Sequence, residues 1–313
     1  MRETDLLQHI IERSRRLSEL GPDAGVVVGP GDDCAVLAAS NGGRLLATVD
    51  QLVEGRHYDS ATAPTRLIAR KAMARAVSDI AAMGGRPRWA MAAACLPEGY
   101  RHADELFDHM AEWAMRFECP LVGGDIAASP PGSPLVLSVT ALGEALKGRR
   151  AITRSGARPG DVLLVTGRIG GSFTSGRHMT FNPRIREALW LTEELGESLH
   201  AMIDISDGLG RDAGRIAGAS RVRIELNPTA IPLNEDASDW RAALGDGEDY
   251  ELLCAVAPEK ASGLPPMIPG TLTPVSPIGR VLSAASPCDL GCFVPLEKGG
   301  WERADEYGWD HRT

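Results

Sequence analysis

Two aspartates, Asp33 and Asp50, flank a predicted β-hairpin and are the first candidates for chemistry. The strand-like residues 34–38 and 45–50 surround Asn41-Gly42-Gly43, a strong hairpin-turn signal. A two-residue loop at Asn41-Gly42 places Asp33 directly opposite Asp50, with Cβ atoms about 4.5–5.5 Å apart, where like charges destabilise the pair unless a cation compensates. This register predicts a divalent-cation site. A longer loop shifts the register and leaves acidic turn residues in solvent.

Asp79 lies near the end of a helix predicted over residues 66–83, and Lys71 and Arg75 precede it at intervals of four. A negative charge near a helix C-terminus opposes the helix dipole, so its position needs an explanation. One explanation is an ion pair with Arg75, worth only about 0.2–0.5 kcal/mol on a helix surface. The other is a place in a metal site.

Two further aspartates follow predicted strands. Asp125 comes after the strand 120–122 through two glycines, where the backbone can approach a phosphate or metal closely. Asp204 ends a second strand, and a helix capped by Ser206 or Asp207 is expected to follow. Capping explains one polar residue, and helix N-termini also attract phosphate. Asp204 itself lies in an apolar strand, where an unpaired carboxylate costs several kcal/mol.

The last acidic cluster runs from Asp246 to Glu251 before an apolar strand, and a solvated turn is its simplest alternative. Magnesium prefers oxygen ligands and shares them with nucleotide phosphates, and phosphoryl transfer depends mainly on positioning and charge neutralisation. The sequence contains no GxxxxGK(S/T) P-loop and no HRD or DFG kinase motif. These patterns indicate a magnesium-dependent phosphotransferase of another architecture.

Composition agrees with a soluble enzyme. The 313 residues suit two domains, and the 43% hydrophobic and 24% charged residues are typical of globular proteins. The net charge of −9 argues against nucleic acid or an anionic membrane as a partner and suits cation binding. No apolar stretch approaches the length of a membrane span and the N-terminus is charged, so we expect a cytoplasmic protein. The six scattered cysteines are predicted to be reduced structural thiols.

Mixed helices and strands must position these residues. A segment rich in basic and turn residues at 147–160 indicates a boundary between two halves. Hydrophobic periodicity predicts helices at 4–15, 66–83 and 103–117 and a helix after Ser206, and strands at 26–28, 34–38, 45–50, 120–122, 135–142, 162–166, 202–205, 222–226 and 251–256.

Seven blocks in one order carry a resemblance that spans nearly the whole chain. The chain resembles the thiamine-monophosphate kinases, of the aminoimidazole ribonucleotide synthetase-like superfamily. The blocks, joined by a terminal GWDH at 308–311, are GPGDDCAVL (29–37), VDQLVEGRHY (49–58), SDIAAMGGRP (78–87), GGD (123–125), TRSGARPGD (153–161), IDISDGL (203–209) and GDGEDYEL (245–252).

The resemblance implies a two-domain α+β fold. Residues 1–148 would form an N-terminal α+β domain that binds ATP and magnesium and whose strands build a barrel with a second subunit. Residues 149–313 would form a C-terminal α/β domain. The ATP site would lie between the subunits of a homodimer.

The resemblance also implies roles for individual residues. Several Mg²⁺ ions would be held by Asp33, Thr48, Asp50, Asp79, Asp125, Asp204 and Asp207. ATP would lie near Gly124, Asp125, Arg154 and Ser206. Thiamine monophosphate would contact His57, Glu248 and Trp309. The implied reaction transfers the ATP γ-phosphoryl group directly to the phosphate of thiamine monophosphate, with Arg154 and the metals stabilising charge and no protein nucleophile or base.

The chain departs from the family pattern at Val49 and Ile126, where a threonine is common. Both changes remove a hydroxyl, which leaves the number of metal ions open. One rival is another ATP-using member of the superfamily, but the reactive cysteines expected near the N-terminus or at the C-terminus of such members are absent. The other rival is a paralogue that binds these ligands without turnover.

Overall fold

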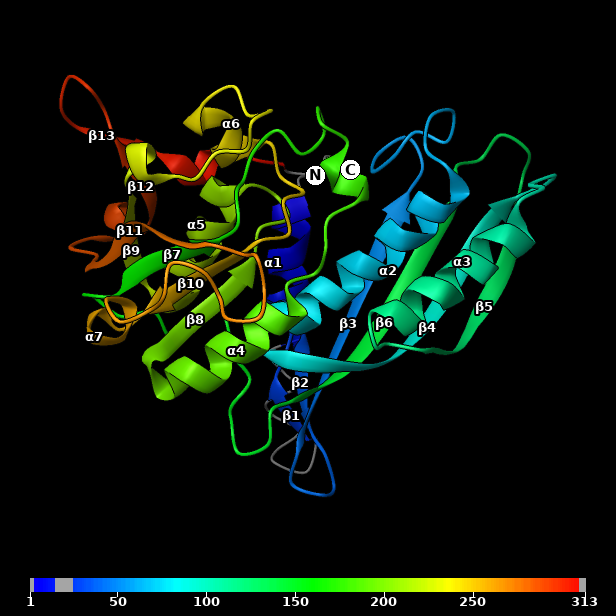
Figure 1. Cartoon of the computed structure of the whole chain (residues 1–313), viewed down its shortest axis with the longest axis horizontal. Coiled ribbons are helices and arrows are strands. Elements are labelled where there is room, and N and C mark those ends of the chain that lie inside the picture. The colour runs from blue at the N-terminus through cyan, green and yellow to red at the C-terminus, as the bar shows by residue number, and fades with distance from the viewer. Residues whose placement is uncertain (1–2, 15–24, 310–313) are drawn as a thin grey trace.

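Two β-sheets with helices between and around them make up the protein (Figure 1). The computed structural model describes residues 3–14 and 25–309. The first sheet has the strand order β1-β2-β3-β6-β4-β5, and the second has the order β13-β12-β9-β11-β7-β10-β8. None of the helices in these ranges is long and apolar enough to span a bilayer.

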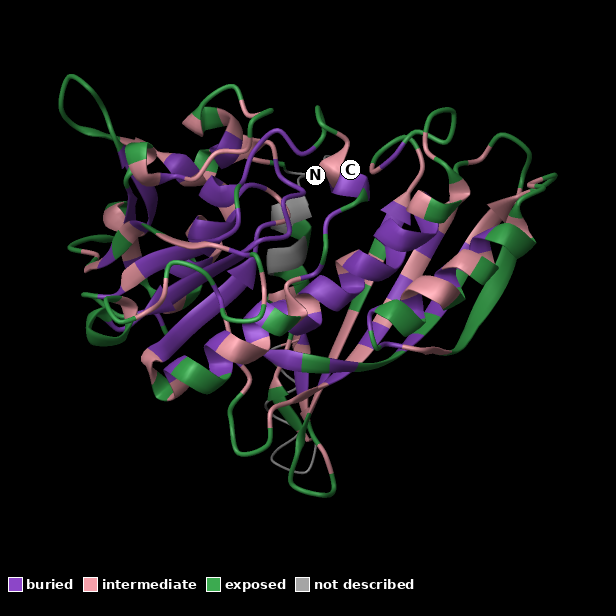
Figure 2. Ribbon diagram, in the orientation of Figure 1, coloured by how far each residue is buried: buried purple, intermediate pink, exposed green. Residues whose placement is uncertain are grey.

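The first half of the chain forms the first sheet and its helices. Its elements are α1 (Glu3–Ser14), β1 (Val26–Val28), β2 (Ala35–Ala38), β3 (Arg44–Val53), α2 (Thr65–Ala82), β4 (Gly85–Pro97), α3 (Ala103–Arg116), β5 (Leu121–Ser129) and β6 (Val136–Ala145). Burial alternates along most of β4 and β6, with an interruption at Arg88 and Trp89 where the pairing of β4 shifts, as expected of a sheet with one covered face. Helices α2 and α3 cover that face, and the opposite face is exposed, most fully on β5 (Figure 2).

The second half forms the second sheet. Its elements are β7 (Val162–Thr166), α4 (Ile185–Leu195), β8 (Leu199–Asp204), α5 (Leu209–Ser220), β9 (Val222–Leu226), α6 (Trp240–Gly245), β10 (Leu252–Val256), α7 (Pro258–Ala261), β11 (Val275–Ser283), β12 (Gly291–Pro295) and β13 (Trp301–Arg303). Strands β7, β8 and β10 are buried along most of their length, since helices or loops cover both faces.

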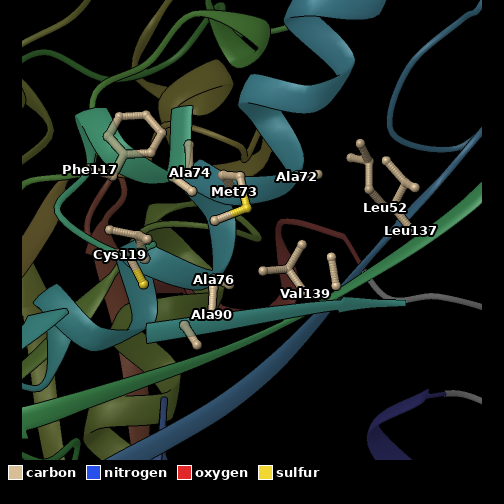
Figure 3. Packing of buried hydrophobic residues seen from close by; sticks show 14 of the residues in the cluster. Leu52, Ala72, Met73, Ala74, Ala76, Ala90, Phe117, Cys119, Leu137 and Val139 are labelled. Atoms are coloured by element: carbon tan, nitrogen blue, oxygen red, sulfur yellow. The ribbon is translucent and has the colours of Figure 1, made fainter. Parts of the chain in front are cut away.

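Helix α2 is the central element, because it packs on the first sheet and also contacts β8 and α4 of the second half. Its alanine-rich face lies close to the sheet, and Ala72 and Ala76 belong to one buried cluster with Leu52, Leu137 and Val139 of the sheet (Figure 3). Small side chains allow this close approach and so bring residues of α2 near the end of β8.

The hairpin between β2 and β3 has a different register from the one predicted. Ala38 pairs with Arg44, and the Ala39 backbone N–H donates to the Gly43 carbonyl oxygen at 3.1 Å, so residues 40–42 form a three-residue loop, with Gly42 at φ +80°. A three-residue loop with its last residue in the left-handed region is a common hairpin type, and here it shifts the pairing by one residue. The predicted direct opposition of Asp33 and Asp50 is therefore wrong, and Asp33 lies outside β2 altogether.

Other expectations are confirmed or corrected. The helices predicted at 66–83 and 103–117 are present as α2 and α3. The strand predicted at 120–122 is wrong in length, because β5 runs through both glycines and Asp125 to Ser129. The sequence pattern missed β4, β11, β12 and β13. Residue 15 of the first predicted helix and residues 310 and 311 of the GWDH block lie outside the described ranges.

The close contact between α2 and the first sheet gives a stability prediction. A Cβ added at Gly143 of β6 would lie 2.5 Å from Ile80 Cγ2 and 2.9 Å from the Arg86 carbonyl oxygen. We expect Gly143→Ala to lower the free energy of unfolding by about 1–3 kcal/mol through overpacking. The matched control is Gly218→Ala in α5, where nothing lies within 4 Å and a gain of about 0.5–1 kcal/mol is expected. Urea denaturation measures both, and a neutral Gly143→Ala would contradict the packing described.

Candidate functional site: a buried carboxylate group beside an aromatic pocket

Asp33, Asp79 and Asp204 form one group, which we call the carboxylate group. Asp33 follows β1, Asp79 lies in the last turn of α2, and Asp204 ends β8. One carboxylate oxygen from each lies within 4.8 Å of the others. Three segments far apart in the sequence therefore converge because α2 packs against both halves of the chain.

Hydrogen bonds orient each of these carboxylates. Arg154 donates to Asp33 Oδ1 from Nε and Nη2, at 3.2 and 2.6 Å. The Thr48 hydroxyl donates to Asp79 at 2.6 Å, and the Ser78 hydroxyl donates to Asp204 at 2.5 Å. Of these partners, Ser78 was not among the predicted site residues, although it directly precedes Asp79.

Burial and mutual repulsion disfavour the ionised forms of Asp79 and Asp204. Burial, followed by the charge of Asp33, raises the pKa of Asp204 to about 8. Burial, with the charges of Asp204, Asp50 and Asp33, also raises the pKa of Asp79 well above its usual value. Neighbouring Asp32, which accepts the Arg154 backbone N–H at 3.1 Å, has its pKa raised to about 6 by burial and by Asp33.

A hard divalent cation fits this arrangement. The buried Asp33 Oδ2 has no hydrogen-bond partner, which is costly unless something else satisfies it. The donors gathered here are all oxygens, the ligand type that Mg²⁺ prefers. A cation would also offset the burial and the mutual repulsion that raise the pKa values of Asp79 and Asp204.

Asp50 lies close by but is paired differently. Arg75 donates to both of its carboxylate oxygens, at 2.7 and 2.9 Å, and also lies 3.5 Å from Glu248 Oε1. The interpretation of Asp79 as an ion-pair partner of Arg75 is therefore wrong, since the guanidinium turns to Asp50 and Glu248. Arg75 thus links a predicted metal-binding carboxylate to a predicted substrate-binding one.

Asp207 and Ser206 occupy the turn before α5. The Asp207 carboxylate forms an ion pair with Arg215 and does not belong to the carboxylate group. The expected capping of α5 by Ser206 or Asp207 is wrong, since Gly208 is the N-cap. Instead the buried Asp212 accepts the backbone N–H groups of Ser206 and Asp207, both at 3.0 Å. Asp212 could have been found from the sequence, because a carboxylate in the first turn of a predicted helix is favourably placed near backbone N–H groups.

Gly124 and Asp125 lie apart from the carboxylate group. They belong to the edge strand β5, and strands β4 and β6 separate β5 from β3. Gly124 has a packing role, because a Cβ there would lie 1.9 Å from the Ala92 carbonyl oxygen. Asp125 follows Gly124 in the strand and therefore points to the opposite face, where it is exposed on the uncovered side of the sheet.

One of the three predicted substrate residues, Trp309, lines a pocket. This pocket of about 380 Å³ is lined by Phe173, Thr174, Gly245, Asp246, Gly308 and Trp309. The Trp309 indole N–H donates to the Asp246 carbonyl at 2.8 Å, and its ring is tilted against Phe173 with centroids 5.9 Å apart. Phe173 lies in the glycine-flanked segment after Gly171 and was not predicted as a site residue.

His57 and Glu248 both contact Lys71 of α2, whose ammonium nitrogen lies 5.4 Å from the centroid of the Phe173 ring. The His57 Nδ1 accepts the Val53 backbone N–H at 2.9 Å, and burial lowers the pKa of His57 to about 4. Its imidazole is therefore neutral at physiological pH. Glu248 has φ +55°, an uncommon conformation for a residue with a side chain and one that functional sites often contain. Its carboxylate forms an ion pair with the buried Lys71, another residue that was not predicted.

Known proteins with similar sequences decide the family. A thiamine-monophosphate kinase of Rhodopirellula baltica is 35% identical to this chain, and the match covers 99% of this chain and 97% of the relative. This chain belongs to the thiamine-monophosphate kinase family. The family member of Bacillus subtilis is 31% identical over 90% of this chain and 91% of its own. Residues 31–145 also match the family described as AIR synthase related protein, N-terminal domain.

Among solved structures, AaThiL complexed with AMPPCP and TMP is similar over the whole chain. The TM-score is 0.79 at 27% identity, with 100% of this chain and 99% of that chain covered. The two-sheet fold described above is therefore the fold of this family. The first sheet is open in this chain, with β1 and β5 at its edges.

The raised pKa of Asp204 gives a stability prediction for this protein without bound metal. The pKa of Asp204 is about 8 in the fold against a usual 3.8, so the folded protein keeps a proton that the unfolded chain loses. Stability should consequently fall as pH rises from about 4 to 8. We expect Asp204→Asn, which cannot ionise, to raise the free energy of unfolding at pH 8 by about 0.5–2 kcal/mol in EDTA. The difference should vanish near pH 4.

Denaturation at several pH values tests this expectation. The matched control is Asp239→Asn, because Asp239 caps the exposed start of α6 with hydrogen bonds to two backbone N–H groups that an asparagine can also accept. The control should show no pH-dependent gain. A metal-free Asp204→Asn variant that is less stable than the parent at pH 8 would contradict the description of the carboxylate group.

Proposed function

We propose that this chain transfers the γ-phosphoryl group of ATP directly onto the phosphate of thiamine monophosphate, giving thiamine diphosphate and ADP. The observation that carries the proposal is the chain of charged contacts between the carboxylate group and the Phe173–Trp309 pocket. It runs from Asp50, whose charge acts on Asp79, through Arg75 and Glu248 to Lys71 near the Phe173 ring. Family membership and the ligands named for AaThiL, AMPPCP and TMP, support the same reaction.

The proposed metal site uses the residues that converge. Asp33, Asp79 and Asp204 would hold Mg²⁺, with Thr48 and Asp50 next to them and Asp207 at the start of α5. When bound, magnesium supplies charge neutralisation for the phosphates of ATP. The chain's own residues would orient the ligands. Val49 has a 65% exposed side chain on the uncovered sheet face, so its missing hydroxyl lies away from the carboxylate group.

The accepting phosphate is already anionic near neutral pH, so the reaction needs no protein nucleophile or general base. Arg154 reaches the carboxylate group from the segment between the two sheets and would stabilise charge on the transferred phosphoryl group. Neutral His57, ionised Glu248 and the Trp309 ring would contact thiamine monophosphate. A tryptophan face attracts a cationic heterocycle, and a carboxylate accepts hydrogen bonds from an aminopyrimidine.

The ATP site is proposed to be completed by a second copy of the chain. Gly124 and Asp125 lie on an edge strand, and the uncovered face of that sheet carries exposed apolar side chains including Val49 and Met91. An exposed apolar face of this kind marks an interface. Pairing two such sheets would form a barrel and would bring Asp125 of one copy to Arg154 and Ser206 of the other. The division at 148/149, between β6 and β7, would separate the dimerising half from the second half.

Turnover tests the reaction itself. Purified protein with ATP, Mg²⁺ and thiamine monophosphate should yield thiamine diphosphate, and its absence while ATP binding is intact would overturn the proposed function. We expect Asp79→Asn to lower kcat by about 100-fold or more, because the cation that stabilises negative charge on the phosphates in the transition state would lose a ligand. Asp239→Asn, at the exposed start of α6, should keep full activity. An Asp79→Asn variant with kcat near the parent value would exclude the carboxylate group from the reaction.

Mixing two inactive variants tests the shared site. If Asp125 acts on the partner's site, Asp125→Asn and Asp204→Asn subunits should be inactive separately. A mixed dimer of the two would contain one intact site. Random mixing should therefore restore about a quarter of the parent activity. A mixture that stays inactive although subunits exchange would place Asp125 and Asp204 of the same subunit in one site. An Asp125→Asn variant that is active by itself would exclude Asp125 from the site.

A further inference from the structure

Lys71 has no exposed side-chain surface, although it is a lysine in the middle of a helix. Lysine is almost never fully buried unless its charge is paired. Its location is informative, because its ammonium nitrogen lies 5.4 Å from the centroid of the ring of Phe173, which lines the aromatic pocket. The proposed function gives this residue no role.

Three partners occupy the ammonium group. It donates to the His57 carbonyl oxygen at 2.7 Å, lies 2.8 Å from His178 Nδ1, and forms an ion pair with Glu248 Oε2. A lysine ammonium has three N–H groups and no acceptor, so His178 Nδ1 must accept, and these three partners together surround the ammonium group. Lys71 is thus enclosed, and its action must pass through the residues it contacts.

Glu248 is the partner whose state depends most on Lys71. Burial opposes ionisation of this carboxylate, whereas the charges of Lys71 and Arg75 favour it, and the pKa of Glu248 lies below its usual value. The Glu248 backbone is held in its left-handed conformation by the hydrogen bond from its N–H to the Ser206 carbonyl, at 2.7 Å. Lys71 and Arg75 contact different oxygens of the carboxylate, which restricts its rotation.

His178 connects the same cluster to the pocket wall. Its ring stacks on Phe173 with centroids 4.4 Å apart, and Phe173 in turn contacts Trp309. A buried ion pair is a weak way to stabilise a fold, because well-packed apolar residues often do as well. The position of this ion pair against the aromatic wall of the pocket favours a role in ligand recognition.

We propose that Lys71 is a positioning residue that holds the Glu248 carboxylate ionised and oriented beside the Phe173–Trp309 pocket, so that the site selects a flat heterocycle bearing N–H donors. This inference rests on the proposed function, since it names the feature of the acceptor substrate that the site reads. Lys71 acts on recognition of the ring, and the carboxylate group acts on the phosphates.

Binding of thiamine monophosphate measured by calorimetry, without ATP, tests the inference independently of turnover. The variants are Lys71→Met, Glu248→Gln and the double variant, with Lys147→Met as a matched control at an exposed lysine. We expect each single variant at the pocket to raise the Kd for thiamine monophosphate by about 30-fold or more, because a charge-paired carboxylate is lost or misplaced. The KM for ATP should change by less than about twofold, and Lys147→Met should match the parent.

The double variant separates positioning from general damage. If Lys71 acts through Glu248, Lys71→Met should add almost nothing to the loss caused by Glu248→Gln. Removing both charges together should also recover the thermal stability that Lys71→Met alone loses, so a poorly folded single variant still leaves the double one informative. The inference is overturned if the two losses add, if ATP and thiamine monophosphate weaken equally, or if the parent does not bind thiamine monophosphate. A parent that binds thiamine monophosphate but makes no product contradicts only the proposed function.

Discussion

Repulsion among three carboxylates, two of them buried and the third half-buried, is the constraint on which the rest of the structure depends. Asp33, Asp79 and Asp204 lie within one ligand-sized space, and burial together with their neighbours' charges raises the pKa values of Asp79 and Asp204. Such a group destabilises a fold unless a cation or protons compensate. The surrounding structure must therefore hold the carboxylates in place against their own repulsion.

Helix α2 contributes most to holding the carboxylates in place. Its alanines and the glycines of β4 and β6 let it lie close to the first sheet, while its other contacts are with β8 and α4. Residues spaced by four along one face then serve different parts of the site. Lys71 holds Glu248, Arg75 bridges Glu248 and Asp50, and Asp79 belongs to the carboxylate group. A single rigid element thereby sets the relative positions of the proposed substrate and metal residues.

Local patterns in the sequence predicted the elements and most of the polar residues of the site. The spacing of Lys71, Arg75 and Asp79 was visible, but their partners were not, because which side chain a helix residue meets depends on tertiary packing. The hairpin register failed by one residue since the loop has three residues and not two. Asp212 was not predicted as a site residue, because it accepts hydrogen bonds from backbone N–H groups of a turn that only the tertiary fold defines. The separation of Asp125 from Asp33 likewise depends on strand order, which alternating patterns do not determine.

The most direct test of the account is the location of a bound cation. Mn²⁺ can replace Mg²⁺ at oxygen sites and is visible by anomalous X-ray scattering. In crystals grown with Mn²⁺ and a non-hydrolysable ATP analogue, the account predicts an anomalous peak about 2.0–2.3 Å from one oxygen each of Asp33, Asp79 and Asp204. Mn²⁺ bound elsewhere, with these three carboxylates close together and free of metal, would contradict it.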